Sequence, residues 1–147
     1  MPPLSGPVAV VGSRHGSPWP VAPVVRAILA AGGVVRTGCA PGVDAAARAA
    51  APGAVVVSAS APQFAGLPRP VALAARTRAV VAGALALVVF PPASGVLGPG
   101  SALAVSCALE RFIPVWVAGS WPGAGWQACT LAGVPGWLLT PAQPALF

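Results

Sequence analysis

Short apolar runs alternate with helix-like segments along most of the chain, and this alternation limits the possible folds more than any other feature. The runs predict strands at residues 8–11, 34–36, 54–58, 85–90 and 113–117, and helical patterns occupy residues 20–31, 43–50, 69–82 and 101–111. Strands that are apolar on both faces and separated by helices are typical of a parallel sheet with right-handed crossovers. The sequence therefore predicts a three-layer α/β fold with a mostly parallel sheet of five to six strands, in which Gly136–Leu139 supplies the sixth.

The chain length of 147 residues suits one domain and leaves little room for two. We expect a ligand-binding domain at residues 1–118, a Gly- and Trp-rich extension at 119–140 packed on the same domain, and a flexible tail at 141–147. The extension contains Trp121, Trp126 and Trp137, which we expect to be exposed. Together with the apolar composition, these side chains predict self-association into a homo-oligomer.

The apolar composition raises the question of a membrane segment, because 56% of the residues are hydrophobic and only 7% are charged. The longest apolar stretch, residues 79–90, is only 12 residues long, whereas a spanning helix needs about 20. The first residues have no basic region ahead of an apolar run, so they lack the pattern of a signal peptide. We therefore expect a cytoplasmic protein without a membrane partner.

The charged residues are unevenly divided by sign. All eight basic residues are arginine, and only Asp44 and Glu110 oppose them, which gives a formal net charge of +6. Such a surplus attracts polyanions irrespective of their sequence. The alternative is that the charge serves only to keep an apolar surface soluble.

The three cysteines, Cys39, Cys107 and Cys129, are far apart and form no CxxC pair. The single histidine does not complete a zinc-ligand spacing. We therefore expect buried structural thiols, no metal site and no cofactor.

Three of the predicted strands end in glycine-rich loops, which should open on one edge of the sheet. The loops contain Gly12-Ser13-Arg14, residues 38–42, and residues 95–100, the last of which leads into a helix through Gly98-Pro99-Gly100-Ser101. Small residues and helix N-termini expose backbone N–H groups to an anion, and Ser13 and Arg14 add a hydroxyl and a guanidinium. Because ligands of such sheets bind beyond the carboxyl ends of the strands, the convergence predicts a site for a phosphate-bearing ligand. The spacing matches neither the dinucleotide GxGxxG motif nor a P-loop.

Side chains next to these loops have alternative roles. Asp44 belongs to the first turn of a helix, where the dipole favours a carboxylate, and it could also bond a ribose or a loop amide. Ser101 could cap its helix, bind phosphate, or do both. Arg76 and Arg78 are two positions apart on one helix, so one should reach the strand ends and the other should meet solvent.

Groups suited to catalysis are scarce. The chain has one His, one Asp and one Glu, and Glu110 lies away from the glycine loops. No Ser-His-Asp set or pair of carboxylates is evident, and active sites usually need several positioned groups. The sequence favours binding over chemistry and predicts no catalytic residue.

Four segments of the chain resemble motifs of the SLOG superfamily and follow one another in the same order as those motifs. This superfamily joins the DNA-processing protein A family to the Lonely Guy family. They are VAVVGSR (8–14), TGCAPGVDAAA (37–47), RTRAVVAGALALVVFP (76–91) and GPGSALAVSCALERFIPVWV (98–117). The resemblance covers residues 7–118 and is closest to short, stand-alone members. It implies a Rossmann-like domain that binds nucleotides, nucleotide derivatives or single-stranded DNA, and so a module related to DNA processing. By motif position, the ligand-binding residues would be Gly12, Ser13, Arg14, Gly38, Gly42, Asp44, Arg76, Arg78, Gly98, Gly100 and Ser101.

The chain departs from both families. Lonely Guy enzymes carry a glutamate soon after a Gly-Gly-x-Gly-Thr loop, where this chain has Ala102, Leu103 and Ala104. DNA-processing proteins have Arg-Asn-Arg where this chain has Arg76-Thr77-Arg78, and they also use lysines, which are absent here. Two alternatives stay open: a nucleoside-monophosphate phosphoribohydrolase, and a sensor or sponge of a signalling nucleotide such as an ADP-ribose derivative.

The last five residues resemble a different motif, the short peptide by which bacterial replication and repair proteins bind the sliding clamp. The match consists of Gln143, two variable residues, and then Leu146 and Phe147. A disordered tail with such an anchor can enter an apolar pocket. The alternative is a chance match in a Pro- and Ala-rich tail.

Overall fold

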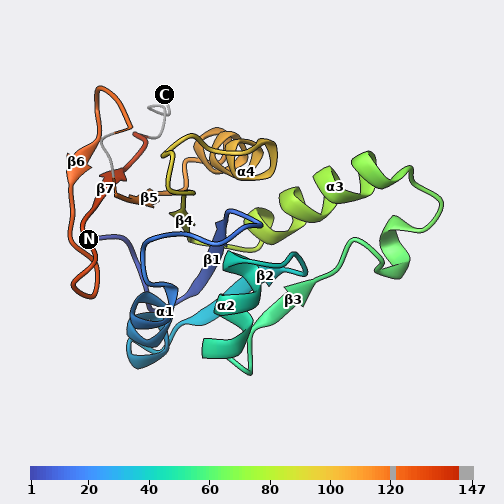
Figure 1. The fold of residues 1–147 in the computed structure, drawn as a ribbon, viewed down its shortest axis with the longest axis horizontal. Coiled ribbons are helices and arrows are strands. Elements are labelled where there is room, and N and C mark those ends of the chain that lie inside the picture. Colours follow the sequence, from blue (N-terminus) through green and yellow to red (C-terminus); the bar gives the residue numbers. More distant parts are fainter. Residues whose placement is uncertain (120–121, 143–147) are drawn as a thin grey trace, which may run out of the picture.

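The computed structural model describes residues 1–119 and 122–142. This part of the chain has an α/β fold, with a seven-stranded mixed sheet and four α-helices (Figure 1). The elements in chain order are β1 (Pro7–Gly12), α1 (Val21–Ala30), β2 (Val34–Gly38), α2 (Val43–Ala50), β3 (Val55–Val57), the short 3-10 helix η1 (Pro62–Phe64), α3 (Arg69–Ala82), β4 (Ala86–Phe90), α4 (Pro99–Glu110), β5 (Val115–Ala118), β6 (Gln127–Ala128) and β7 (Gly136–Leu139).

The sheet has the strand order β3-β2-β1-β4-β5-β7-β6. Strands β3, β2, β1, β4 and β5 pair in parallel, whereas β7 is antiparallel to both β5 and β6. The prediction of a mostly parallel sheet with five or six strands is therefore wrong, because the sheet is mixed and has seven described strands. A parallel pairing of β5 and β7 would usually need a crossover helix between them. The described residues between these strands form β6 and turns and contain no helix, so β7 pairs antiparallel to β5. The missed strand, β6, has two residues and is too short to show a periodic pattern.

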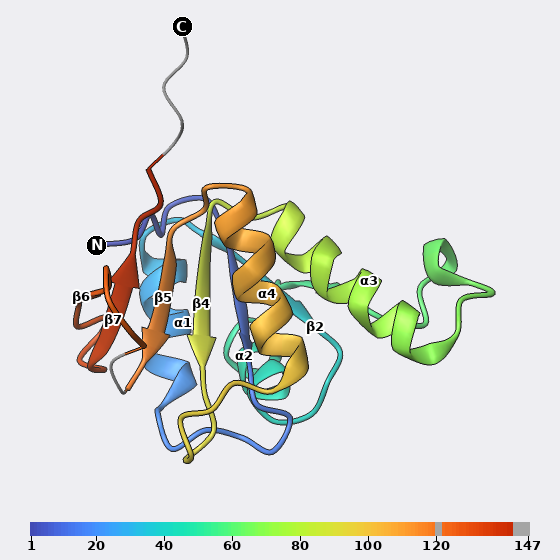
Figure 2. The same cartoon turned by 90° about the horizontal axis from the view of Figure 1, so that it is seen from above.

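Two hydrophobic cores lie on opposite faces of the sheet. In β1, Val8 and Val10 are buried in the core that contains residues of α1 and α2, whereas Ala9 and Val11 are buried in the core that contains residues of α3 and α4. Figure 2 shows α4 crossing one face of the strands and α1 lying on the other. The prediction that the first strand is buried on both faces is confirmed.

The extension after residue 118 shares the core on the α1 and α2 face through Leu131 and Val134. The indole of Trp116 donates to the Cys129 carbonyl at 2.8 Å, and that of Trp137 donates to the Gly119 carbonyl at 3.0 Å. Trp137 and Trp126 are half-buried, contrary to the expectation that they are exposed. Self-association stays a prediction, without the support expected from these two side chains.

Helix α3 extends beyond the edge of the sheet, together with η1 and the segment that joins them (Figures 1 and 2). Its C-terminal end is held to β2 by Arg36, whose Nε donates to the Val80 carbonyl at 3.1 Å and whose Nη2 donates to the Ala79 carbonyl at 3.0 Å. These carbonyls belong to the last turns of α3, where backbone acceptors lack partners within the helix. Arg36 thereby fixes the helix that carries Arg76.

None of the helices in the described ranges combines the length and the apolarity that crossing a membrane requires.

Candidate functional site

A cavity of about 530 Å³ opens where β1, β2 and β4 end, and α3 and the start of α4 complete its wall. This position lies next to β1 and β4, between which the strand order reverses direction. Ligands of open α/β sheets bind at such reversals. The volume falls within the range of about 300–1,000 Å³ that is usual for small-molecule sites.

The three glycine-rich loops meet at this cavity, as the sequence predicts. Gly42 and Arg78 do not line it. The predicted residues that do line it are Gly12, Ser13, Arg14, Gly38, Asp44, Arg76, Gly98, Gly100 and Ser101.

The loop after β1 is held in place by backbone hydrogen bonds. The Ser13 amide donates to the Phe90 carbonyl at 3.2 Å, and the Ser13 carbonyl accepts from the Val43 amide at 3.0 Å. A Cβ on Gly12 would collide with the Phe90 carbonyl and lie 2.7 Å from Val43 Cγ2. Only glycine therefore lets β1, β4 and α2 approach so closely, and the loop carries Arg14 exposed at the mouth of the cavity.

Gly42 has a positioning role. Its φ is +74°, and a Cβ there would collide with the Ser13 carbonyl and lie within contact distance of Arg14 backbone atoms. Glycine adopts this conformation without steric cost. Gly42 therefore lets the loop before α2 pack directly against the loop after β1, and it has no place in the cavity wall itself.

Asp44 is buried, with 5% of its surface exposed, and it lines the cavity. Its Oδ2 accepts a hydrogen bond from the Ala40 amide at 3.3 Å, so the structure shows the loop-amide role for this carboxylate. Burial raises the pKa of Asp44, and the Ala40 amide and the positive charges of Arg76 and Arg48 offset this only in part. A carboxyl group with a perturbed pKa in a cavity is a candidate for a functional role.

Arg48 stabilises the loop between β2 and α2. Its Nη1 donates to the carbonyls of Gly38 at 2.8 Å and Ala40 at 3.0 Å. These bonds place the neighbouring residues of the loop around Asp44. Arg48 was not predicted as a site residue, and its contacts are structural.

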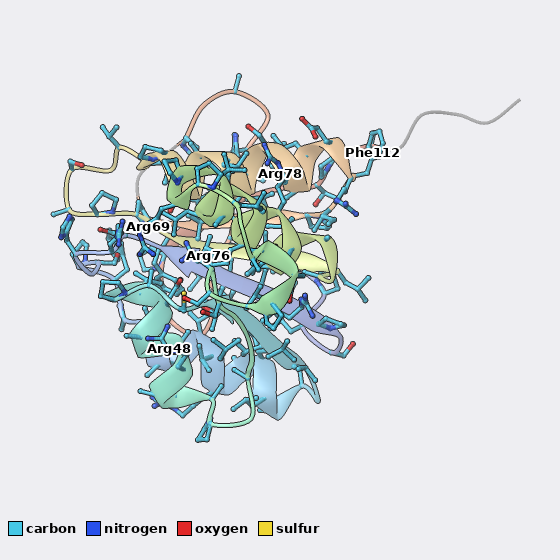
Figure 3. All side chains as sticks on the ribbon, turned by 90° about the vertical axis from the view of Figure 1, so that its right-hand side faces the viewer. Arg48, Arg69, Arg76, Arg78 and Phe112 are labelled. Carbon is cyan, nitrogen blue, oxygen red and sulfur yellow. The ribbon has the colours of Figure 1, made fainter. Side chains whose placement is uncertain are left out.

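Arg76 reaches the cavity from α3, and Figure 3 shows it on the side of α3 that faces Arg48 of α2. Its Nη1 donates to Cys39 Sγ at 3.6 Å. Its Nε is buried and has no hydrogen-bond partner among the described residues. A buried donor without a partner costs about 1–3 kcal/mol, so an acceptor that reached this N–H would remove that cost.

Arg78 lies on another side of α3, next to α4 in Figure 3, and is exposed. The prediction that Arg76 and Arg78 face differently is confirmed. The placement of Arg78 as a ligand residue by motif position has no geometric support in this cavity.

Helix α4 begins at the cavity and presents its N-terminal end. Gly98 is its N-cap residue, and no side chain caps the helix, so Ser101 does not act as the cap. Ser101 is buried in the first turn and lines the cavity beside Gly100. Pro99 has no N–H, and the Ala102 amide already bonds the Gly98 carbonyl at 2.9 Å. The amides of Gly100 and Ser101 have no earlier carbonyl of the helix to bond, which leaves them for an anion.

Helix α3 gives the cavity an apolar wall that the sequence did not predict. Leu73, Thr77 and Val80 line it on the same side of the helix as Arg76. These residues lie three and four positions apart, as the helical repeat requires for one face of a helix. Once Arg76 is assigned to the site, this spacing predicts that they line it too. His15, exposed beside Arg14, also lines the cavity and was missed.

The three thiols are not all buried as expected. Cys107 is buried and Cys129 is half-buried, but Cys39 is exposed. Cys39 follows the last residue of β2, where the chain turns along the cavity, and the helical or strand packing that buries apolar residues does not reach it.

Other candidate residues fall outside this site. Glu110 is exposed at the C-terminal end of α4, and the predicted clamp-binding residues Gln143, Leu146 and Phe147 lie outside the described residues. Residues 1–119 and 122–142 contain no group of three side chains able to hold a metal ion. A scan against models of protein families and a search of curated proteins each gave no match to this chain.

Proposed function

We propose that the cavity binds the phosphate of a nucleotide, a nucleotide derivative or a nucleic acid, and that the chain is a binding module related to DNA-processing proteins. The observation that carries this proposal is the meeting of two anion-binding elements in one cavity. One is the N-terminal turn of α4 at Gly100 and Ser101, and the other is Arg76 with its unpartnered buried Nε. Each favours a phosphate oxygen on physical grounds.

The fold supports the same proposal. The parallel order β3-β2-β1-β4-β5, with helices packed on both faces, agrees with the strand order expected of a Rossmann-like domain. It is also the fold implied by the resemblance to the SLOG superfamily. The apolar side chains of Leu73 and Val80 on α3 and of Leu103 on α4 give a nucleobase a surface on which to pack.

A thermal-shift series tests the ligand class. AMP, ADP-ribose, adenosine and inorganic phosphate are compared, because a ligand that binds only the folded state raises the melting temperature by mass action. We expect AMP or ADP-ribose to stabilise the protein more than adenosine does. Equal melting temperatures with all four compounds at millimolar concentration would reject a nucleotide site.

A charge-matched pair of variants assigns the effect to the cavity. Arg76→Gln and Arg26→Gln each remove one positive charge, but Arg26 is exposed on α1 and does not line the cavity. One charge-assisted hydrogen bond contributes about 1.5–3 kcal/mol, so Arg76→Gln should weaken nucleotide binding about tenfold or more. Equal losses in the two variants would mean that net charge, and not the cavity, attracts the ligand.

Labelled single-stranded DNA, titrated at two salt concentrations, distinguishes a nucleic-acid ligand from a free nucleotide. The logarithm of the affinity for single strands falls with the logarithm of salt by about 0.7 per phosphate contact. We expect a smaller slope for Arg76→Gln than for Arg26→Gln. Absence of binding at low salt rejects the nucleic-acid ligand and leaves the nucleotide.

A hydrolytic activity is the second candidate, and Asp44 is the observation that favours it. This carboxyl group is buried in the cavity, and burial raises its pKa, as in many general acids. Incubation with nucleoside monophosphates, followed by chromatography, would reveal free base if the glycosidic bond is cleaved. Release of free base by the native protein but not by Asp44→Asn would establish the enzyme, and no free base from either would exclude it for these substrates.

A further inference from the structure

Cys39 is the one exposed thiol among the three, and it lies next to the cavity without being one of its lining residues. The residues on either side of it, Gly38 and Ala40, both line the cavity. Nothing in the proposed binding of a phosphate requires a thiol at this position. The contacts of Cys39 therefore need an explanation of their own.

Arg76 and the two residues that follow β3, Ser58 and Ala59, lie near the sulfur of Cys39. Arg76 Nη1 lies 3.6 Å from Cys39 Sγ, and the Ala59 amide and the Ser58 side chain are close enough to the thiol to lower its pKa. Partial burial raises the pKa of Cys39, but the bonds from Ala59, Arg76 and Ser58, together with the charge of Arg76, outweigh it and give a net lowering. Each of these contacts is better made to a thiolate than to a thiol.

The same guanidinium has a second, unsatisfied donor. Arg76 Nε is buried and without a hydrogen-bond partner among the described residues, and it lies beside Gly38, where a Cβ would be 3.2 Å from it. One N–H of Arg76 thus contacts the sulfur of Cys39, while another N–H of the same cavity-lining side chain has no acceptor among the described residues. A chemical change at Cys39 therefore acts directly on a side chain that lines the binding site.

We propose that Cys39 is a site of thiol–disulfide exchange, coupled through Arg76 to the ligand in the cavity. The coupling, but not the reactivity of the thiol, rests on the proposed function. The co-reactant is a small disulfide that carries a carboxylate. The Cys39 thiolate attacks one sulfur of that disulfide, a new S–S bond forms, the old S–S bond breaks, and the other half leaves as a thiolate.

The product is a mixed disulfide with a carboxylate next to Arg76. Arginine binds carboxylates and phosphates with the same planar arrangement of donors. The attached carboxylate therefore competes with the ligand phosphate for Arg76, and the attached group lies beside the lining residues Gly38 and Ala40. Modification lowers the affinity of the cavity for a phosphate-bearing ligand, and reduction restores it.

The reactivity is tested with a chromogenic aromatic disulfide over a range of pH, by following release of the coloured thiolate. The native protein is compared with Cys39→Ser, Arg76→Gln and the charge-matched Arg26→Gln. We expect one fast-reacting thiol that is missing in Cys39→Ser, and a reaction at neutral pH about threefold or more slower in Arg76→Gln, with its pH midpoint moved upward. A native rate and midpoint in Arg76→Gln, or a Cys39 no faster than Cys129, would overturn the inference.

The coupling is tested by titrating AMP calorimetrically into the native protein before modification, after modification, and after reduction. Cys39→Ser treated in the same way controls for reaction at Cys107 and Cys129. We expect AMP to bind about tenfold more weakly to the modified native protein, and to bind treated and untreated Cys39→Ser equally. Unchanged AMP affinity after modification would refute the coupling. A native protein that does not bind AMP before modification counts against the proposed function, and the reactivity of Cys39 then decides this inference alone.

Discussion

Replacing Arg36 by Met should destabilise the fold, because it removes two hydrogen bonds that attach α3 to the sheet. The guanidinium bonds the carbonyls of Ala79 and Val80 and packs over Gly83, where a Cβ would lie 2.6 Å from its Nε. Hydrogen bonds that involve a charged group contribute about 1.5–3 kcal/mol. The site is half-buried, so water replaces part of the loss, and we expect the free energy of unfolding to fall by about 2 kcal/mol for the two bonds together. Methionine keeps an unbranched apolar stem, which limits the change to the donors.

Thermal and urea unfolding of Arg36→Met and Arg26→Met measure this effect at equal net charge. A loss of about 2 kcal/mol corresponds to a melting temperature lower by about 4–8 °C in a domain of this size. Arg26 is exposed on α1 and forms no hydrogen bond to a carbonyl among the described residues, so its replacement should change stability by less than about 0.5 kcal/mol. Equal stability of the two variants would refute the view that Arg36 holds α3.

Two further variants test the loops of the cavity. Gly42→Ala should lower the free energy of unfolding by about 2 kcal/mol or more, because the residue has a φ of +74° and its Cβ would meet the Ser13 carbonyl. The control is Gly53→Ala, because a Cβ at Gly53 meets nothing within 4 Å. Equal urea midpoints of the two variants would contradict the close approach of the loops. Asp44→Asn should change how stability depends on pH. The folded-state pKa of Asp44 is raised by burial, so in the native protein this group lowers stability as the pH rises from the ordinary Asp value of about 3.9 through the raised value. The Asn variant lacks this term, and its stability relative to the native protein should grow across that window and then level off. A constant difference over this pH range would show that the carboxyl is not destabilised by burial.

Most elements of the fold could be predicted because their signals are local. The run at Val8–Val11 and the glycine after it mark a strand buried on both faces, and α3 was expected at the residues where the structure has it, Arg69–Ala82. The convergence of the loops also follows from the sequence, because the carboxyl ends of parallel strands share one edge. The pairing of β7 could not be predicted in the same way, since its antiparallel direction depends on a connection without a helix and on contacts far along the chain.

The roles of individual side chains were harder to predict than their positions. Arg36 and Arg48 have nothing in their neighbouring residues that separates them from Arg76, yet the first two bond backbone carbonyls and only the third keeps a buried donor free of a partner among the described residues. The partners of Arg36 are more than 40 residues away in the sequence. Cys39 was expected to be buried because most free cysteines are, and its exposure depends on the path of a loop that no periodic pattern describes.

This division among the arginines changes the meaning of the net charge of +6. Arg36 and Arg48 donate hydrogen bonds to backbone carbonyls and remain positively charged, because a carbonyl is neutral. They therefore still add to the long-range potential that attracts any polyanion. In the proposed site, contacts with a particular ligand would depend instead on the groups that line the cavity, Arg76 and Arg14, and on the first turn of α4. Long-range attraction is screened over about 10 Å at 0.1 M salt, whereas a bond to a buried donor is screened much less. As the salt concentration rises, binding that depends only on net charge should therefore be lost at a lower concentration than binding that includes the contact with Arg76, which separates attraction of polyanions in general from recognition of one ligand.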